Sequence, residues 1–473
     1  MGQEISVDHF SSAARARFKQ CLSTETTLLR DTLASGQFSA SGFVAGFELE
    51  AWLLDRHLFP VANNETYLAH LNHPLVVPEL SRFNIELNGT PLALQGNALM
   101  RMEHELAGTW RQCRLKARDI GSELIMIGIL PTVREQDLCL ANMSPLNRYH
   151  VLNAEVIKRR HGKPITVDIR GRDQLSLSHS DVMLEAAATS FQVHLQIPAE
   201  KAARYYNASL MLCGPLVAAT ANAPYLFQHD LWEETRIPLF EQSVNLGERM
   251  AKRVTFGSGY LQESIVECFE ENIADYEILL PVKFDSSPMH FEHLRLHNGT
   301  IWRWVRPLIG LDQTGRPHVR IEQRVMAAGP SIIDQIANAA FYYGAVHYLA
   351  EQPHPPETDL PFTAIRDNFY HAARHGLDAI FQWPQARSVT AGALILDHLL
   401  PLAAQGLTML GIDQHSRSRY LDVIDARIQS RQTGASWQHA NLAYHHGDYQ
   451  QLTASYLRHQ LRGQPVHTWN PCS

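Results

Sequence analysis

Apolar and polar residues alternate in four short segments that lie far apart along the chain, at residues 44–54, 82–89, 190–198 and 318–325. Successive side chains of a β-strand point to opposite faces of its sheet. The period of two therefore predicts four strands, each with one apolar face and one polar face. The polar faces hold Glu48 and Glu50; Asn84, Glu86 and Asn88; Gln192, His194 and Gln196; and Arg320, Glu322 and Arg324.

A helical period replaces this alternation towards both ends of the chain. The first forty residues are amphipathic with helical spacing, and apolar residues recur at helical spacing in several segments beyond Gly329-Pro330. Between these regions, short strands and helices are interleaved. We therefore predict an α+β body over residues 1–330 and an all-helical C-terminal region over residues 331–473 that packs on it. The segment TGASWQ (433–438) is expected to tether this region to the body.

Composition and charge exclude several classes of protein. Of the 473 residues, 45% are hydrophobic and 19% are charged, which excludes a disordered chain and supplies a sizeable core. The net charge of −7 and the lack of Lys/Arg-rich runs argue against a nucleic-acid partner. The longest apolar run, Leu124–Leu130, is too short to span a membrane, and we find neither a signal peptide nor a CxxC pair. We expect a cytoplasmic globular protein.

The polar faces of the four predicted strands allow two interpretations. A sheet with one solvated face is common. However, none of these faces contains a lysine, and Glu48 and Glu50 run directly into the apolar residues 51–54. Buried carboxylates this close together repel each other unless a cation lies between them. Several carboxylates suit Mg²⁺, and arginines on the same face can hold phosphate or carboxylate oxygens, so the pattern indicates metal-assisted phosphoryl or acyl chemistry.

The common nucleotide-binding and nucleophile motifs are absent from the sequence. It contains no GxxxxGK[ST] loop, no GxGxxG opening a helix after a strand and no GxSxG turn. An ATP site must therefore be built from sheet and metal rather than from a phosphate-binding loop.

A series of motifs follows the order found in one enzyme superfamily. The motifs are GFELE (46–50), RFNIELNGTP (82–91), NMSPLNRYHVLN (142–153), TSFQVHLQIP (189–198), GPLVAATANAPYLF (214–227), GTIWRWVRP (299–307) and HVRIEQRV (318–325). Together they resemble the glutamate–cysteine ligase superfamily of ATP-dependent carboxylate–amine ligases, over residues 42–330.

The resemblance implies a glutamine-synthetase-like fold, in which the concave polar face of a curved antiparallel sheet holds ATP, Mg²⁺ (or Mn²⁺) and an amino acid. It implies that the γ-carboxylate of glutamate is phosphorylated and then attacked by an amine such as cysteine. Arg306 and Arg324 would be catalytic and neutralise the transferred phosphoryl group. His194 would either bind the metal or donate a hydrogen bond to a phosphate, since imidazole is an unusual ligand for Mg²⁺. The implied metal ligands are Glu48, Glu50, Glu86, Glu322 and His194.

Further residues are implied in binding ATP or substrate. Asn222 is either part of a helix-ending turn or part of the pocket, and Arg236 is either a helix-surface charge or a clamp for a substrate carboxylate. Trp302 and Trp304 stand where relatives often have a tyrosine and smaller residues, which predicts an altered acyl or acceptor pocket. The implied set is Gln192, Gln196, Arg148, Asn222, Arg236, Trp304 and Arg320.

Two other functions compete with the ligase, and two groups of residues are discounted. A metal-dependent amidase or peptidase would have lost ATP, and a binding protein would have lost catalysis; neither needs both Arg306 and Arg324. The histidines of MHFEHLRLH (289–297) and AYHHGD (443–448) fit no zinc spacing, and the carboxylates of residues 263–277 are favoured as a solvated helix face. We expect small-molecule substrates and a possible homo-oligomer.

Overall fold

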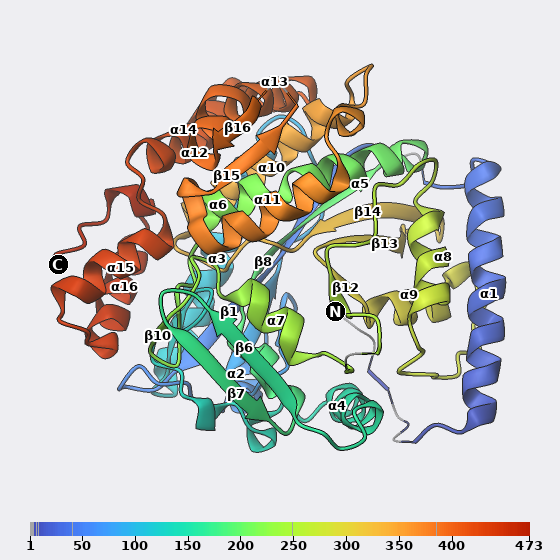
Figure 1. Ribbon diagram of the computed structural model, residues 1–473, viewed down its shortest axis with the longest axis horizontal. Helices are drawn as coiled ribbons and strands as arrows, with labels where there is room; N and C mark the ends of the chain where they lie inside the picture. Colours follow the sequence, from blue (N-terminus) through green and yellow to red (C-terminus); the bar gives the residue numbers. More distant parts are fainter. Residues whose placement is uncertain (1–3, 6, 8, 40, 248, 385) are drawn as a thin grey trace.

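The computed structural model describes residues 4, 5, 7, 9–39, 41–247, 249–384 and 386–473. At its centre lies a curved antiparallel sheet of eight strands in the order β13-β14-β8-β1-β3-β2, with β4 and β5 both paired to β1 (Figure 1). The four segments with alternating patterns become β1, β3, β8 and β14, as predicted. The strands of the sheet are β1 (Val44–Leu54), β2 (Val76–Pro78), β3 (Asn84–Asn88), β4 (Leu92–Ala93), β5 (Glu123–Ile125), β8 (Phe191–Ile197), β13 (Val305–Leu311) and β14 (Pro317–Gln323).

Cross-strand pairing places the polar residues of these strands on one face. Glu50 faces Glu86 across β1 and β3, and Glu322 faces His194 across β14 and β8. On its other side Glu322 faces Arg306 of β13. Because paired residues point to the same side of a sheet, charged groups that are more than 200 residues apart in sequence share one surface.

The opposite face of the same strands is buried under helices. Leu49, Val193 and Ile321 are fully buried there. Helix α10 packs on β8, and the hydroxyl of its Tyr343 donates a hydrogen bond to the backbone oxygen of Gly46 at 3.1 Å. The helices are α1 (Ser12–Ala34), α2 (Asn64–Leu71), α3 (Ala98–Asp119), α4 (Asn147–Arg159), α5 (Ala202–Met211), α6 (Cys213–Thr220), α7 (Arg236–Ser243), α8 (Val266–Asp275), α9 (Glu292–Gly299), α10 (Ile332–Ala350), α11 (Phe362–His375), α12 (Ala391–Leu394), α13 (Leu400–Met409), α14 (Gln414–Gln429), α15 (Gly434–Tyr444) and α16 (Tyr449–Arg462).

Among the described residues, the C-terminal region consists of helices and one hairpin. Strands β15 (Ile380–Trp383) and β16 (Ala386–Thr390) pair antiparallel, so the prediction of an all-helical region is wrong at this point. In the structure Phe381 and Trp383 are buried while Ile380 and Gln382 are exposed, which is the alternation of a strand. The apolar Ile380 conceals this alternation in the sequence. The remaining small strands are β6 (Ile165–Arg170), β7 (Gln174–His179), β9 (Tyr225–Leu226), β10 (His229–Asp230), β11 (Val254–Thr255) and β12 (Trp302–Arg303).

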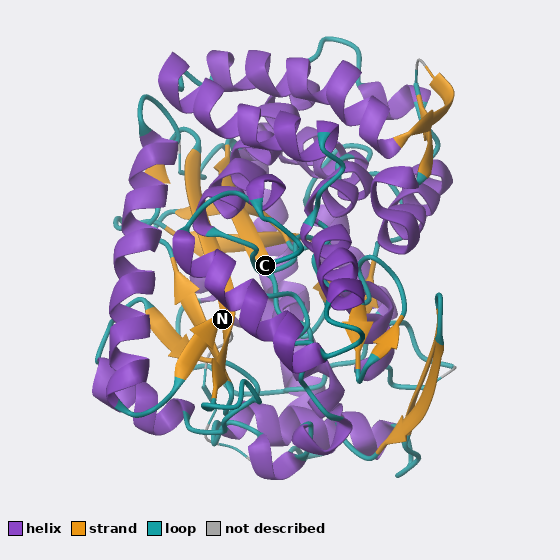
Figure 2. Cartoon of the chain, turned by 90° about the vertical axis from the view of Figure 1, so that its left-hand side faces the viewer, coloured by secondary structure: helices purple, strands orange, loops and turns teal. Residues whose placement is uncertain are grey.

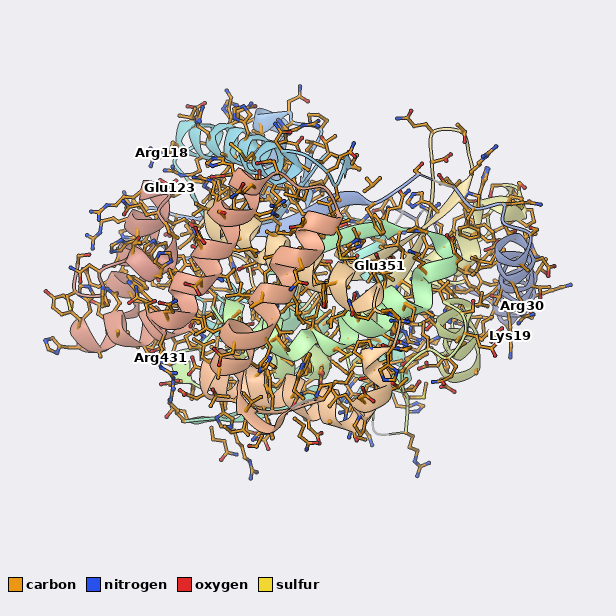
Figure 3. The ribbon with its side chains drawn as sticks, turned by 90° about the horizontal axis from the view of Figure 1, so that it is seen from above. Lys19, Arg30, Arg118, Glu123, Glu351 and Arg431 are labelled. Carbon is orange, nitrogen blue, oxygen red and sulfur yellow. The ribbon has the colours of Figure 1, made fainter. Side chains whose placement is uncertain are left out.

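Helices enclose the central sheet on several sides (Figure 2). Helix α1 packs on α8 and α9 at one end of the molecule, and α15 and α16 lie at the other end. Lys19 and Arg30 of α1 and Arg431, which follows α14, mark these two ends in the view from above (Figure 3). Among the described residues, no helix has both the length and the apolar character that crossing a membrane requires.

Candidate functional site

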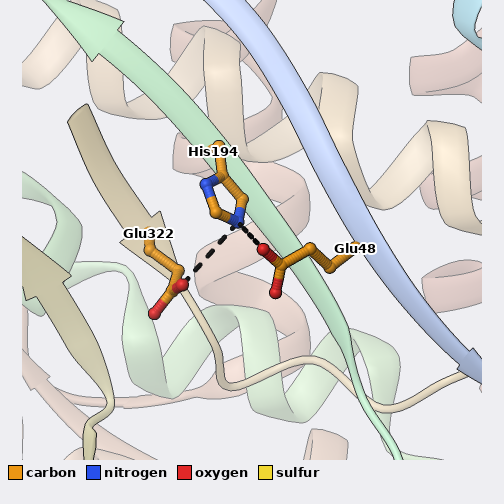
Figure 4. A group of neighbouring side chains, drawn as sticks. All are labelled: Glu48, His194 and Glu322. Atoms are coloured by element: carbon orange, nitrogen blue, oxygen red, sulfur yellow. Dashed lines mark ion pairs between the residues drawn. The ribbon is translucent and has the colours of Figure 1, made fainter. Parts of the chain in front are cut away.

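A first group of possible metal ligands lies at the middle of the polar face. His194 of β8 stands between Glu48 of β1 and Glu322 of β14 (Figure 4). Its Nε2 atom is 3.4 Å from Glu48 Oε1 and 3.7 Å from Glu322 Oε1, and the three ligand atoms lie within 4.8 Å of one another. The Nε2 atom is buried and has no hydrogen-bond partner of good geometry. The three residues can therefore hold one cation.

A second group lies one step further along β1. Glu50 and its cross-strand partner Glu86 are joined by Glu79, which follows β2, and their oxygens also lie within 4.8 Å of one another. Glu79 was not predicted from the sequence. Strand β2 has three residues, too few to show an alternating pattern, so the only available signal was the position of Glu79 shortly before the glutamate-bearing strand β3.

The environment of the second group favours a bound cation. Burial, followed by the neighbouring carboxylate of Glu79, raises the pKa of Glu50 to about 7. Burial, followed by Glu48 and Glu79, raises the pKa of Glu86 well above its ordinary value. Without a cation these carboxyl groups retain protons near neutral pH, and a divalent cation would displace them because it relieves both burial and repulsion.

The first group is electrostatically different, because positive side chains surround it. Burial alone would raise the pKa of Glu48, but the nearby His194 outweighs burial and lowers it to about 2. Burial acts in the same way on Glu322, and Arg306 and Arg324 outweigh it, so that the pKa of Glu322 falls well below its ordinary value. Both carboxylates are therefore ionised near neutral pH.

The two predicted catalytic arginines converge on Glu322. Arg306 Nε and Nη2 donate to the two oxygens of Glu322 at 2.7 and 3.0 Å, which is a two-pronged ion pair. Arg324 Nη1 donates to Glu322 Oε2 at 2.9 Å and also to the side-chain oxygen of Gln192. The sequence placed these arginines on the site face, and the structure adds that each is tied to a predicted metal ligand.

The far end of the polar face is basic. Arg320 faces Gln196 across β14 and β8, and its Nε atom is buried without a hydrogen-bond partner. Gln196 donates to the backbone oxygen of Ser41 at 3.3 Å. Next to them, the ring of His318 lies over Gly310, where a Cβ atom would be 2.4 Å from His318 Nε2. This end can accept an anionic group beside the carboxylate groups.

A pocket opens next to the second group of possible metal ligands (Glu50, Glu79 and Glu86), at the acidic end of the polar face. Its walls bring together predicted residues from separate elements. Arg236 begins α7 and donates through Nη2 to the backbone oxygen of Val325 at 3.0 Å, and Trp304 donates through Nε1 to Glu241 at 3.0 Å. Its polar and aromatic lining consists of Glu50, Glu79, Asn84, Glu185, Thr189, Ser190, Arg236, Phe240, Trp304 and Arg324.

Comparison with known proteins identifies the family. The sequence model of glutamate–cysteine ligase family 2 matches residues 44–455. The chain belongs to glutamate–cysteine ligase family 2. It is therefore a ligase of the glutamate–cysteine ligase type, and its substrates are small molecules. No curated protein matches the chain.

Two solved structures share the fold of this family member. One is glutamate–cysteine ligase from Francisella tularensis in complex with AMP, with a TM-score of 0.59 and 10% sequence identity, covering 92% of this chain and 91% of that chain. The other is a bifunctional glutathione synthetase from Pasteurella multocida, with a TM-score of 0.51 and 12% identity, covering 93% of this chain and 55% of that chain. The predicted superfamily resemblance and the predicted curved antiparallel fold are confirmed.

Asn222 lies outside the lining of the pocket. Its side-chain amide donates to the backbone oxygen of Ala328 at 2.7 Å and to the hydroxyl of Tyr456 at 2.8 Å, and its oxygen accepts from Gln438 at 2.9 Å. The side chain is fully buried and its polar atoms are used inside the protein, which favours the structural alternative; contact with a substrate stays a prediction. The predicted tether, in contrast, is confirmed, because Ala435 and Gln438 of TGASWQ donate to residues 221 and 222.

Arg148 lies at the start of α4, outside the lining of the pocket. It donates to the hydroxyl of Tyr149 at 3.0 Å, and its guanidinium lies 4.7 Å from the centre of that ring. Its charge lowers the pKa of Glu79, against the larger effect of burial. Arg148 thus acts on the second carboxylate group, while direct contact with a substrate stays a prediction.

The discounted histidines and carboxylates have structural partners. His293 Nδ1 lies 2.6 Å from Glu25 Oε1, and His297 Nε2 lies 2.9 Å from the backbone oxygen of Asn272. Glu270 forms an exposed ion pair with Arg30. Within the described part of the chain, only the two carboxylate groups on the sheet face have ligand atoms close enough to share a metal.

Proposed function

We propose that this ligase uses ATP and Mg²⁺ to phosphorylate the side-chain carboxylate of glutamate and joins the activated carboxylate to an amine such as cysteine. The observation that carries the proposal is the pair of three-residue metal groups on one sheet face. Glu48 and Glu50 are two residues apart on β1 and point to the same face, so the two groups of ligands are neighbours on the sheet. Mn²⁺ could replace Mg²⁺ in such oxygen-rich sites.

The residues present fit divalent cations. Glu50, Glu79 and Glu86 offer only carboxylate oxygens in a buried setting, which is the donor set that Mg²⁺ takes. Glu48, Glu322 and His194 would hold a second ion next to them. Such ions, when bound, neutralise the phosphate charges and reduce the repulsion between ATP and the attacking carboxylate.

The side chains of the chain itself supply the rest of the arrangement. Arg320 and Gln196 line the basic end, where the nucleotide phosphates would lie, and Arg324 stands between the metal groups and the pocket. In the pocket, Arg236 would hold the second carboxylate of glutamate, while Phe240 and Trp304 cover it and exclude water. This arrangement brings two anionic substrates together between fixed positive charges, which a hydrolase has no need to do.

ADP formation tests the proposal directly. Purified protein with ATP, Mg²⁺, glutamate and cysteine should release ADP and phosphate and form an amide between the two amino acids, detected by mass spectrometry. Omission of either amino acid should abolish amide formation, and EDTA should abolish ADP release. The variant Glu270→Gln, which removes an exposed carboxylate on α8, is the matched control and should retain full activity. Cleavage of an amide without ATP would contradict the proposal and support the amidase alternative.

A further inference from the structure

The pocket contains one carboxylate that the proposed function does not use. Glu185 lies in the short 3₁₀-helix η3 (Val182–Ala187), between β7 and β8, and lines the same pocket as Arg236 and Arg324. It belongs to neither of the two metal groups found in the described residues. The flanking residues are apolar, which gave no sign in the sequence that this glutamate faces a site.

The other carboxylates of the pocket already have partners. Glu50 accepts hydrogen bonds from the backbone N–H of Ser190 at 2.8 Å and from the side chain of Gln192 at 3.0 Å, and it belongs to the second metal group. Glu79 accepts from the backbone N–H of Leu80 at 2.8 Å and belongs to the same group. The functions of these two carboxylates are thus explained by the metal site.

Glu185 has no such partner. Its carboxylate accepts no hydrogen bond and forms no ion pair with any residue that the structure describes. Burial, followed by the charges of Glu79 and Glu50, raises its pKa to about 8, and Arg324 only partly opposes this effect. A half-buried carboxylate that borders a pocket and lacks a donor is costly unless a cationic group of a ligand occupies the pocket.

The positive groups of the pocket lie on other elements. Arg324 is held by Glu322 and Gln192 beside the metal groups, and Arg236 is fixed by Val325 and lies 3.2 Å from Glu234. The pocket is therefore bordered by two guanidinium groups that protein partners hold in place, and by the carboxylate of Glu185, which has no such partner among the described residues. This set matches the charges of an amino dicarboxylic acid, which has two carboxylates and one ammonium group.

We infer that Glu185 binds the α-ammonium group of the amino acid substrate and thereby selects amino acids over simple carboxylic acids. The inference rests on the proposed function, in which Arg236 holds the second carboxylate of glutamate and the reacting carboxylate lies beside the metal ligands, where Arg324 acts on the transferred phosphoryl group. It adds a specificity-determining residue that contacts the substrate without taking part in phosphoryl transfer.

Two analogues of glutamate distinguish the contact to its ammonium group from the contact to its α-carboxylate. Glutarate is glutamate without the ammonium group, and 4-aminobutyrate is glutamate without the α-carboxylate. The wild-type protein should prefer glutamate to both. The variant Glu185→Gln should raise KM for glutamate about 10- to 100-fold, with kcat at saturation within about threefold, because a hydrogen-bonded charge pair is lost only in binding. Its KM for glutarate should not change, so the preference for the ammonium group should disappear.

Matched variants keep the test decisive. Glu185→Asp retains the charge and should restore part of the preference for glutamate over glutarate. Glu200→Gln, which removes an exposed carboxylate in the short helix η4 (Ala199–Lys201) outside the pocket, should behave like wild type. The melting temperature of Glu185→Gln should be unchanged or higher, because the variant removes a carboxylate that Glu79 and Glu50 repel.

The contradicting results are distinct. If Glu185→Gln keeps the wild-type preference for glutamate over glutarate, or loses kcat equally with both donors, Glu185 does not bind the ammonium group. If the wild-type protein forms no ADP with any of the three donors, the proposed function itself is wrong, and the assignment of Glu185 falls with it.

Discussion

At the scale of single residues, the site depends on carboxylates that the protein holds close together at a cost. One carboxylate oxygen each of Glu50, Glu79 and Glu86 lies within 4.8 Å of the other two. Replacing one of them by glutamine removes repulsion from the metal-free protein but would also remove a ligand of the proposed metal ion. Stability and activity should therefore respond in opposite directions.

The variant Glu50→Gln measures this opposition. We expect turnover of ATP to fall at least about 100-fold, because a ligand to the cation is lost, while the melting temperature in EDTA stays equal or rises. Steady-state ADP release and thermal unfolding check the two effects, with Glu270→Gln as the control. Full activity in Glu50→Gln would show that the second group binds no essential metal.

The pH dependence of stability provides a second test. The pKa of Glu50 is about 7 in the folded metal-free protein and 4.5 in the ordinary reference, so the folded state retains a proton that the unfolded state has lost between these values. Stability from this group is therefore lost as pH rises from about 4.5 through 7. In EDTA, the melting temperature of wild type should decrease relative to that of Glu50→Gln over this range, and saturating Mg²⁺ should remove the difference. Parallel curves in EDTA would contradict the assignment.

A substitution of Arg324 tests whether its planar guanidinium group is needed for phosphoryl transfer. The variant Arg324→Lys keeps the charge and loses the planar guanidinium that serves Glu322 and Gln192 at the same time. We expect kcat to fall about 100-fold or more while the dissociation constant for Mg-ADP changes less than about threefold. Calorimetric titration and steady-state kinetics measure both quantities. An increase confined to KM for glutamate would reassign Arg324 to substrate binding.

The alternating pattern placed the glutamates of the longer strands on one face, and the family motifs added Arg236 and Trp304, which lie outside those strands. Neither signal found Glu79 or Glu185. Glu48, Glu86 and Glu322 were recognised because the period of two assigns each a face. Glu79 and Glu185 lie beside a three-residue strand and in a 3₁₀-helix, where no period exists. Their function depends on which elements meet in space, which a single segment of sequence does not encode.

At the scale of elements, the C-terminal helices rely on close backbone contact. A Cβ atom at Gly344 of α10 would lie 2.2 Å from the backbone oxygen of Ala403 in α13, and one at Gly406 would lie 1.9 Å from the backbone oxygen of Gly344. Only glycine permits this approach, so helix spacing and not conformational freedom explains these two positions. The sequence predicted both helices but could not predict that they cross at these glycines.

The variant Gly344→Ala should destabilise the protein by about 1–3 kcal/mol, because the added methyl group forces α10 and α13 apart. Gly108→Ala is the matched control, since a Cβ atom at Gly108 within α3 meets no atom within 4 Å. It should be stabilising by roughly 0.5–1 kcal/mol through helix propensity. Denaturant titration measures both. A neutral Gly344→Ala would show that the helices are packed less closely than described.

At the scale of the whole molecule, the body and the C-terminal region share one hydrophobic core. Arg427 of α14 forms a buried ion pair at 2.7 Å with Asp334 of α10 and also donates to the backbone oxygen of Ala219 in α6 at 3.1 Å. Helix α10 in turn covers the apolar face of the sheet. The domain boundary at residue 330 stays a prediction. The helical pattern of apolar residues begins there, but the hydrophobic core contains residues from both sides of it.

A chain ending at residue 330 should therefore lose cooperative folding. Removal of α10 would expose the apolar side of β1, β8 and β14, and the fragment should aggregate or show no sharp thermal transition. Light scattering and calorimetry of residues 1–330, compared with the full chain, measure this expectation. A soluble fragment with a cooperative transition would establish the body as an independent domain.

In the proposed reaction, the carboxylate of glutamate attacks the γ-phosphate of ATP, and the amine then displaces phosphate. In the first step one carboxylate oxygen of glutamate bonds to phosphorus. In the second step the bond between that oxygen and carbon breaks as the amide forms, and the oxygen therefore leaves with the phosphate. Glutamate labelled with ¹⁸O in its side-chain carboxylate should transfer one ¹⁸O atom to phosphate for each amide formed, as measured by mass spectrometry. Phosphate without ¹⁸O, formed while the amide accumulates, would contradict the account.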